Sequence, residues 1–98
     1  MSFVVVARYL AAPGERDGLL PLLDEMAHES RKEPGNRVYR AHLGSEDDRL
    51  VVLYEEYDSE DAFKAHCETE HFQRIVLGQI VPRLESREVF RLNPRGEL

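Results

Sequence analysis

The 98-residue sequence predicts an α+β fold of the ferredoxin-like type, with the order β-α-β-β-α-β and an antiparallel four-stranded sheet. Three observations lead to this prediction. Four segments are rich in β-branched and aromatic residues, two regions between them repeat apolar residues at helical spacing, and Pro-Gly or polar clusters separate them. Because single domains commonly have about 100–150 residues, residues 1–98 are expected to form one domain.

The first half of the chain predicts a strand, a helix and a hairpin. The opening strand ends at the turn Pro13-Gly14, and apolar residues at i, i+3, i+4 and i+7 within Leu19–Met26 predict an amphipathic helix. Pro21 removes one helical hydrogen bond, so the helix either starts near Asp17 or kinks. Pro34-Gly35 then ends it. The predicted elements are Phe3–Leu10, Glu15–Lys32, Arg37–Leu43 and, after the loop Gly44–Asp48, Arg49–Tyr57.

The second half predicts two helical segments and a last strand. Ser59 is a good N-cap, because its hydroxyl can accept from a free N–H in the first turn. Thr69 can cap a second helix in the same way, and Pro82 closes that helical region. The predicted elements are Ser59–Cys67, Thr69–Val81 and Glu85–Leu92, followed by the polar tail Asn93–Leu98.

The predicted strands carry apolar side chains on both faces, whereas the helices can cover only one. In the first strand, Phe3 and Val5 point to one side and Val4 and Val6 to the other. An exposed apolar face of a few hundred Å² marks an interaction site. The same face of a second copy is its simplest cover, so we expect a homodimer with sheet packed on sheet.

Composition argues against several partners. The formal net charge is −6 and the arginines are interleaved with acids, which disfavours nucleic acid. Apolar runs such as Phe3–Ala7 are far shorter than the roughly 20 residues that cross a bilayer, so no membrane span is expected. The N-terminus has no basic leader, and the single Cys67 forms no internal disulfide. We therefore expect a cytoplasmic protein.

Three stretches, taken together and in this order, resemble the antibiotic biosynthesis monooxygenase superfamily of small dimeric α/β-barrel proteins. They are FVVVARYLAAPGERDGLL, then EPGN at Glu33–Asn36, and then LVVLYEEYDSEDAFKAHCETEHFQRI. The resemblance implies quinol- or anthrone-type monooxygenases that use O2 without flavin or metal, so no cofactor is expected. It also implies an isomerase acting on a phosphorylated sugar derivative, and relatives that degrade haem. The chain departs from the common pattern at Tyr57, where many members have tryptophan, and at Asn36, where many have cysteine.

Two histidines are the candidate bases for such chemistry. A cofactor-free oxygenase must deprotonate an electron-rich substrate in an apolar pocket, and an imidazole suits this because its pKa lies near neutral. His66 and His71 are five residues apart and would diverge on one continuous helix. A break near Glu68-Thr69 would let both point at one cavity. The alternative is that both histidines are structural.

Glu55 is the third catalytic candidate, since it lies on a strand that otherwise reads as buried. It could orient a histidine or exchange a proton; alternatively, it pairs with Arg8, Arg40 or Arg87. The candidate substrate-binding residues are Tyr39, Tyr57, Phe63, Phe72 and Asn36, the last being otherwise a turn residue. No metal site is predicted, because the two histidines lack the i, i+4 spacing of a helical zinc pair. One histidine would suffice as a haem ligand.

The leading hypothesis is cofactor-independent monooxygenation of a small quinol- or anthrone-like aromatic substrate, with His66 or His71 as base. The second is an isomerase or other proton-transfer enzyme acting on a small metabolite, phosphorylated or not, with Glu55 and a histidine sharing the proton. The third is a ligand-binding dimer without catalysis, in which these polar groups are satisfied structurally.

Overall fold

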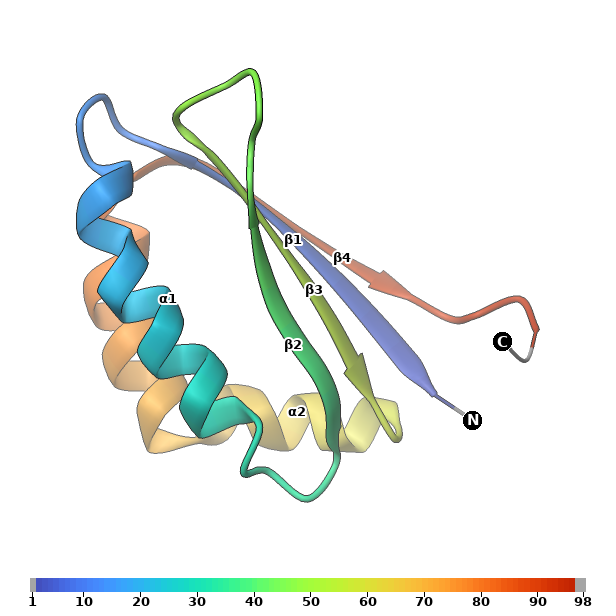
Figure 1. The fold of residues 1–98 in the computed structure, drawn as a ribbon. Helices are drawn as coiled ribbons and strands as arrows, with labels where there is room; N and C mark the ends of the chain where they lie inside the picture. The colour runs from blue at the N-terminus through green and yellow to red at the C-terminus, as the bar shows by residue number, and fades with distance from the viewer. Residues whose placement is uncertain (1, 97–98) are drawn as a thin grey trace.

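Figure 1 shows a four-stranded sheet with the helices gathered on one of its faces. This computed structural model describes residues 2–96; Met1 and the end of the predicted tail, Glu97 and Leu98, lie outside the described residues. The elements in chain order are β1 (Phe3–Ala11), α1 (Arg16–Ser30), β2 (Asn36–Leu43), β3 (Leu50–Tyr57), α2 (Glu60–Glu68), η1 (Phe72–Ile80), η2 (Val81–Arg83) and β4 (Leu84–Leu92).

The predicted βαββαβ topology is confirmed. The strand order is β2-β3-β1-β4, and every neighbouring pair is antiparallel. The register aligns one row of residues across the whole sheet: Tyr39 is opposite Glu55, Glu55 is opposite Val5, and Val5 is opposite Arg91. Because side chains alternate along a strand, these four residues share the face that the helices cover.

The helical elements depart from regular α geometry in the second half. The predicted segment Thr69–Val81 is helical, but η1 is a π-helix, and the Val81 N–H continues its wide pattern by donating to the Val76 carbonyl. Pro82 has no N–H to extend that pattern, so the short 3-10 turn η2 follows. In the first half, α1 begins at Arg16, beside the predicted start, and runs through Pro21.

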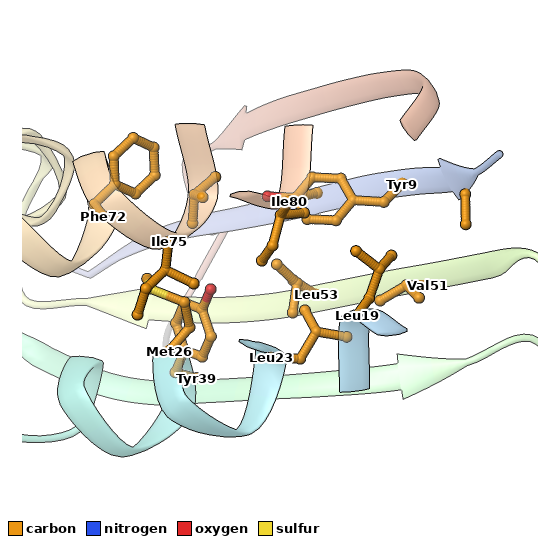
Figure 2. Packing of buried hydrophobic residues seen from close by; sticks show 13 residues of the cluster. Tyr9, Leu19, Leu23, Met26, Tyr39, Val51, Leu53, Phe72, Ile75 and Ile80 are labelled. Atoms are coloured by element: carbon orange, nitrogen blue, oxygen red, sulfur yellow. The ribbon is translucent and has the colours of Figure 1, made fainter. Parts of the chain in front are cut away.

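Two groups of buried side chains hold the helices on the sheet. The larger joins α1 and η1 to the strands, and Figure 2 shows its side chains meeting between the two layers. Its most enclosed members include Leu19, Met26, Val51, Leu53, Ile75 and Ile80. The smaller group packs α2 against the sheet and consists of Phe3, Val5, Tyr57 and Phe63. The smaller group adjoins the candidate site.

Within the described residues, the opposite face of the sheet carries no helix, and part of it is apolar, as the sequence predicts. Val4 and Val6 of β1 lie on it, opposite Leu92 and Phe90 of β4. Phe90 and Leu92 are 45% and 43% exposed. Within residues 2–96, no helix is long and apolar enough to span a membrane.

Candidate functional site

The buried position of His66 follows from where α2 begins and which of its faces packs on the sheet. The Ser59 hydroxyl accepts from the Ala62 N–H at 3.2 Å, which confirms the predicted N-cap. Phe63 and His66, three residues apart, form the buried face of this helix. His66 is only 2% exposed. Its ring centroid lies between 5.3 and 6.1 Å from those of four aromatic side chains, Tyr39, Tyr57, Phe63 and Phe72.

The predicted break after α2 lies at Thr69, whose backbone is extended (φ −66°, ψ 154°). Its hydroxyl donates to the His66 carbonyl at 2.7 Å and accepts from the Phe72 N–H at 3.2 Å, so it caps one helix and starts the next. The change of direction brings His71 back toward His66. The two imidazoles converge on one carboxylate, that of Glu33, and His66 alone of the two lines the cavity described below.

Glu33 lies just beyond α1 and accepts from both histidines. His66 Nδ1 is 3.0 Å from each of its carboxylate oxygens, and His71 Nε2 is 2.6 Å from Oε2. Burial raises the pKa of Glu33, but the two imidazoles outweigh it and leave that pKa below its ordinary value. Glu33 is therefore ionised and can only accept, so His66 Nδ1 and His71 Nε2 carry the hydrogens.

A glycine lets the loop that carries Glu33 approach α2. A Cβ added to Gly35 would lie 2.5 Å from the Ala62 Cβ, a distance that side chains do not tolerate. The Gly35 carbonyl accepts from the Asp58 N–H at 2.9 Å, which ties the loop to the start of the helix region. The absence of a side chain at Gly35 thus sets the distance between Glu33 and His66.

Glu55 lies on the other side of the same imidazole. It is 4% exposed, its Oε1 accepts from the Tyr57 hydroxyl at 2.5 Å, and His66 Nε2 is 3.9 Å away. Burial raises the pKa of Glu55, and the Tyr57 and His66 contacts offset only part of this. Burial also raises the pKa of Tyr57 far above its ordinary value, so this phenol remains a donor. Of the predicted arginine partners, Arg8 pairs with Glu88 instead.

These groups adjoin a cavity of about 300 Å³ between the sheet and the α2–η1 layer. Small side chains, Val5 and Ala7, occupy the middle of its floor and leave the space open. Glu55 lies toward one end of the floor and Arg91 toward the other, two strands apart. The full lining is Val5, Ala7, Tyr9, Tyr39, Glu55, Phe63, His66, Cys67, Phe72, Leu77, Arg87, Val89 and Arg91.

The cavity includes five of the eight residues that the sequence singled out, namely Tyr39, Glu55, Phe63, His66 and Phe72. The other three lie behind it. Tyr57 reaches the cavity only through its bond to Glu55, and His71 only through Glu33. The Asn36 amide donates to the Val38 carbonyl at 3.1 Å, which is a local turn contact. Burial raises the pKa of the Cys67 thiol, so this lining residue is a poor nucleophile.

Sequence reasoning did not identify Glu33 or Arg91 as site residues, and considered Arg87 only as a partner of Glu55. Glu33 gives no local signal, because its partners are 33 and 38 residues away. Arg87, Val89 and Arg91 alternate along β4, so their common face could have been found from the strand period once the register was known.

Glu33, His66 and His71 are also a donor set that could hold a metal, since their ligand atoms all lie within 4.8 Å of one another. Two imidazoles and a carboxylate suit zinc or iron. The spacing rule used on the sequence does not apply here, because the break at Thr69 separates the two histidines. The contacts of 2.6 and 3.0 Å already satisfy the three side chains through hydrogen bonds.

The chemistry available to this arrangement follows from the tautomer of His66. With Nδ1 donating to an ionised carboxylate, a neutral His66 has its lone pair on Nε2, which is directed toward Glu55 at the cavity. Glu33 also stabilises the imidazolium that forms when Nε2 takes a proton. In this tautomer, Nε2 can accept a proton from a molecule in the cavity, and Glu55, whose pKa is raised by burial, lies on the same side of the ring.

Comparison with known proteins gives concordant matches. Residues 2–77 match the family model described as antibiotic biosynthesis monooxygenase. The chain is 33% identical over 81 residues to "Putative monooxygenase Rv0793" of Mycobacterium tuberculosis, covering 81% of this chain and 79% of that protein.

Solved structures agree with this match. That of Rv0793 superposes with a TM-score of 0.90 at 30% identity, covering 99% of this chain and 98% of the other. A crystal structure described as antibiotic biosynthesis monooxygenase gives 0.89 at 28% identity, with 96% and 99% covered. PA3566 from Pseudomonas aeruginosa gives 0.87 at 27%, with 97% and 95% covered. The chain therefore belongs to the antibiotic biosynthesis monooxygenase family, which supports, at the level of the family, a small-molecule monooxygenase.

Proposed function

We propose that this protein catalyses cofactor-independent monooxygenation of a quinol- or anthrone-like aromatic substrate, with His66 as the base. One observation carries the proposal: His66 is fixed by ionised Glu33 on one side and borders an aromatic-lined cavity on the other. Tyr39, Phe63 and Phe72 would hold the flat substrate there.

The proposed reaction begins with proton transfer from an acidic O–H or C–H of the substrate to His66 Nε2. The resulting carbanion passes electrons to O2, and a C–O bond forms to give a substrate hydroperoxide. The second proton on the same carbon is then lost as the O–O bond breaks, so one oxygen stays as a carbonyl and the other leaves as water. For an anthrone, one molecule and one O2 give one quinone and one water, with the substrate supplying all four electrons. In this proposal Glu55 protonates the departing oxygen; its raised pKa and its 3.9 Å distance from His66 Nε2 support this role.

Oxygen uptake with an anthrone such as dithranol tests this proposal. His66→Ala should lower the rate about 10²–10⁴-fold, the usual contribution of a general base. His28→Ala is the matched control, because that imidazole is 72% exposed on α1. Partial recovery of the His66→Ala rate by added imidazole, with an unchanged circular dichroism spectrum, would separate lost chemistry from lost folding. Unchanged oxygen uptake in His66→Ala would contradict the proposal.

A second candidate is proton transfer without oxygen, such as isomerisation of a small metabolite. It is favoured by the 3.9 Å separation of His66 Nε2 and Glu55 Oε1, which allows two groups to share the proton work. Turnover with no oxygen consumed would support it. If neither candidate reaction depends on His66 or Glu55, the third hypothesis, a non-catalytic binding dimer, takes precedence.

The proposal includes a homodimer formed through the helix-free face of the sheet. Its support is the exposure of Phe90 and Leu92 beside half-buried Val4 and Val6. Sedimentation should give twice the mass of one chain, and Phe90→Asp should shift it toward a single chain. A wild-type protein that sediments as one folded chain at micromolar concentration would contradict this assembly.

A further inference from the structure

Two exposed arginines line the cavity, and neither forms an ion pair with a carboxylate among the residues that the structure describes. Arg87 and Arg91 lie on β4, on the same face as Val89. Within residues 2–96, the arginines that form ion pairs are four others, Arg8, Arg37, Arg49 and Arg74. Their planar guanidinium groups are therefore available to bind a carboxylate at the edge of the cavity.

Aromatic rings hold both guanidinium groups in place. The Arg87 Cζ lies 5.8 Å from the centre of the Tyr9 ring, and the Arg91 Cζ lies 5.6 Å from that of Phe63. Such cation–π contacts orient an arginine while leaving its N–H groups free to donate. Glu60 and Glu68 line the shallow depression next to Arg91, together with Lys64, yet neither forms an ion pair with it among the described residues.

The strand register places Arg87 and Arg91 at one end of the cavity and Glu55 at the other. Arg91 and Glu55 are opposite Val5 on its two sides, so two strand spacings of about 4.8 Å, roughly 10 Å in all, lie between their backbones. Arg87 lies four residues from Arg91 on the same face of β4, beyond Val89, and is opposite Tyr9. The floor between the two ends carries only Val5 and Ala7 and the roof is aromatic. A fused bicyclic ring fits this length, with an acidic hydroxyl at His66 and a charged group at the arginines.

We infer that the cavity binds an aromatic carboxylate, whose ring lies over Val5 and Ala7 and whose carboxylate is bound by Arg91 and Arg87. The inference rests on the proposed function and narrows its substrate class from neutral quinols to aromatic acids.

Calorimetric titration with 1-hydroxy-2-naphthoate and with its neutral carboxamide tests the inference, because neither compound has to turn over. The carboxylate should bind at least about tenfold tighter than the amide, and added salt should reduce the difference. Arg91→Gln and the double variant with Arg87→Gln should abolish the preference. Arg74→Gln is the control, since that arginine forms surface pairs with Glu25 and Glu70 and should leave the preference unchanged.

Equal affinity of the two compounds, or binding of neither, would overturn the inference. So would a preference that survives in the well-folded Arg91→Gln, Arg87→Gln double variant. If the double variant does not fold, the single variants decide by the same comparison. The proposed function can fail independently of this inference. If the naphthoate binds in an arginine-dependent way but no oxygen is taken up, the anion site is retained and the oxygenase is rejected.

Discussion

Glu33 and Glu55 are two enclosed carboxylates on opposite sides of one imidazole, and their pKa values are displaced in opposite directions. Glu33 accepts from two histidines, which outweigh its burial and lower its pKa. Glu55 is more deeply buried, accepts from a neutral phenol, and has a raised pKa. The difference shows that the number and charge of the donors, and not the depth of burial alone, decide the direction in which each carboxylate pKa moves.

The largest expected effect comes from replacing the ionised member of this pair. Glu33→Gln removes the negative charge and leaves one oxygen, in place of two, to accept from two imidazole N–H groups, so it should lower the free energy of unfolding by about 3–5 kcal/mol, as removal of one partner of a buried charged pair does. Urea denaturation measures it. Glu25→Gln removes a surface pair with Arg74 and should cost no more than about 1 kcal/mol. Equal losses of unfolding free energy in Glu33→Gln and Glu25→Gln would show that the Glu33 contacts contribute no more than a surface ion pair.

A smaller effect is expected when Glu33 is displaced rather than changed. Gly35→Ala places a Cβ 2.5 Å from that of Ala62, so the loop must move away from α2. Overpacking of this kind costs about 1–3 kcal/mol, and the shift should also lower turnover. Gly96→Ala, with no atom within 4 Å of the added Cβ, is the control. A fully active Gly35→Ala protein would imply that the Glu33–His66 distance does not matter.

The pH dependence of stability should have opposite signs for the two carboxylates. The pKa of folded Glu33 lies below its ordinary 4.5, so its contribution is present above that pH and is lost as pH falls through the folded pKa. The pKa of folded Glu55 lies above 4.5, so its contribution is present below that pH and is lost as pH rises through the folded pKa.

Unfolding free energies measured from about pH 3 to 7 for the wild type and each Glu→Gln variant isolate these contributions, each at about 1.4 kcal/mol per pKa unit. The wild-type minus Glu33→Gln difference should rise with pH, and the wild-type minus Glu55→Gln difference should fall. If both differences in unfolding free energy changed with pH in the same direction, the pKa values of Glu33 and Glu55 would not be displaced in opposite directions.

The smallest effect on stability is expected for Glu55→Gln near neutral pH. An amide resembles the protonated acid, and its oxygen can still accept from the Tyr57 hydroxyl, so the change should stay within about 1 kcal/mol. The oxygen-uptake rate should fall even so, because an amide does not supply a proton to the reaction. A loss of stability as large as that of Glu33→Gln would mean that Glu55 is ionised in the folded protein.

The sequence predicted the fold because its signals are local. β-branched runs marked the strands, Pro-Gly marked the turns, and Ser59 and Thr69 marked two helix starts, all of which are confirmed. The site depends on pairs that are distant in sequence, so it was predicted less completely. His66 and Glu55 stood out as polar residues on apolar faces, whereas Glu33 could be recognised only once the loop after α1 was placed against α2.

The apolar pattern of the sequence also did not predict the type of helix that η1 forms. Apolar spacing identified the buried stripe of η1, including Ile75 and Ile80, but does not distinguish a π-helix from an α-helix over nine residues. The two arginines of β4 were visible as residues, and only the register of β4 against β1 shows that both lie on the cavity side.

Because Thr69 is extended and joins two helical segments, the number of residues between His66 and His71 decides whether both histidines reach Glu33. One residue inserted between Thr69 and His71, in the first turn of the second helical segment, would turn the second imidazole by about 100° relative to the Thr69 cap while leaving His66 in place. Glu33 would then lose one of its two donors without any substitution in the site. In a chain with this fold, the number of residues between His66 and His71 is therefore as informative about function as the identity of the residues on either side.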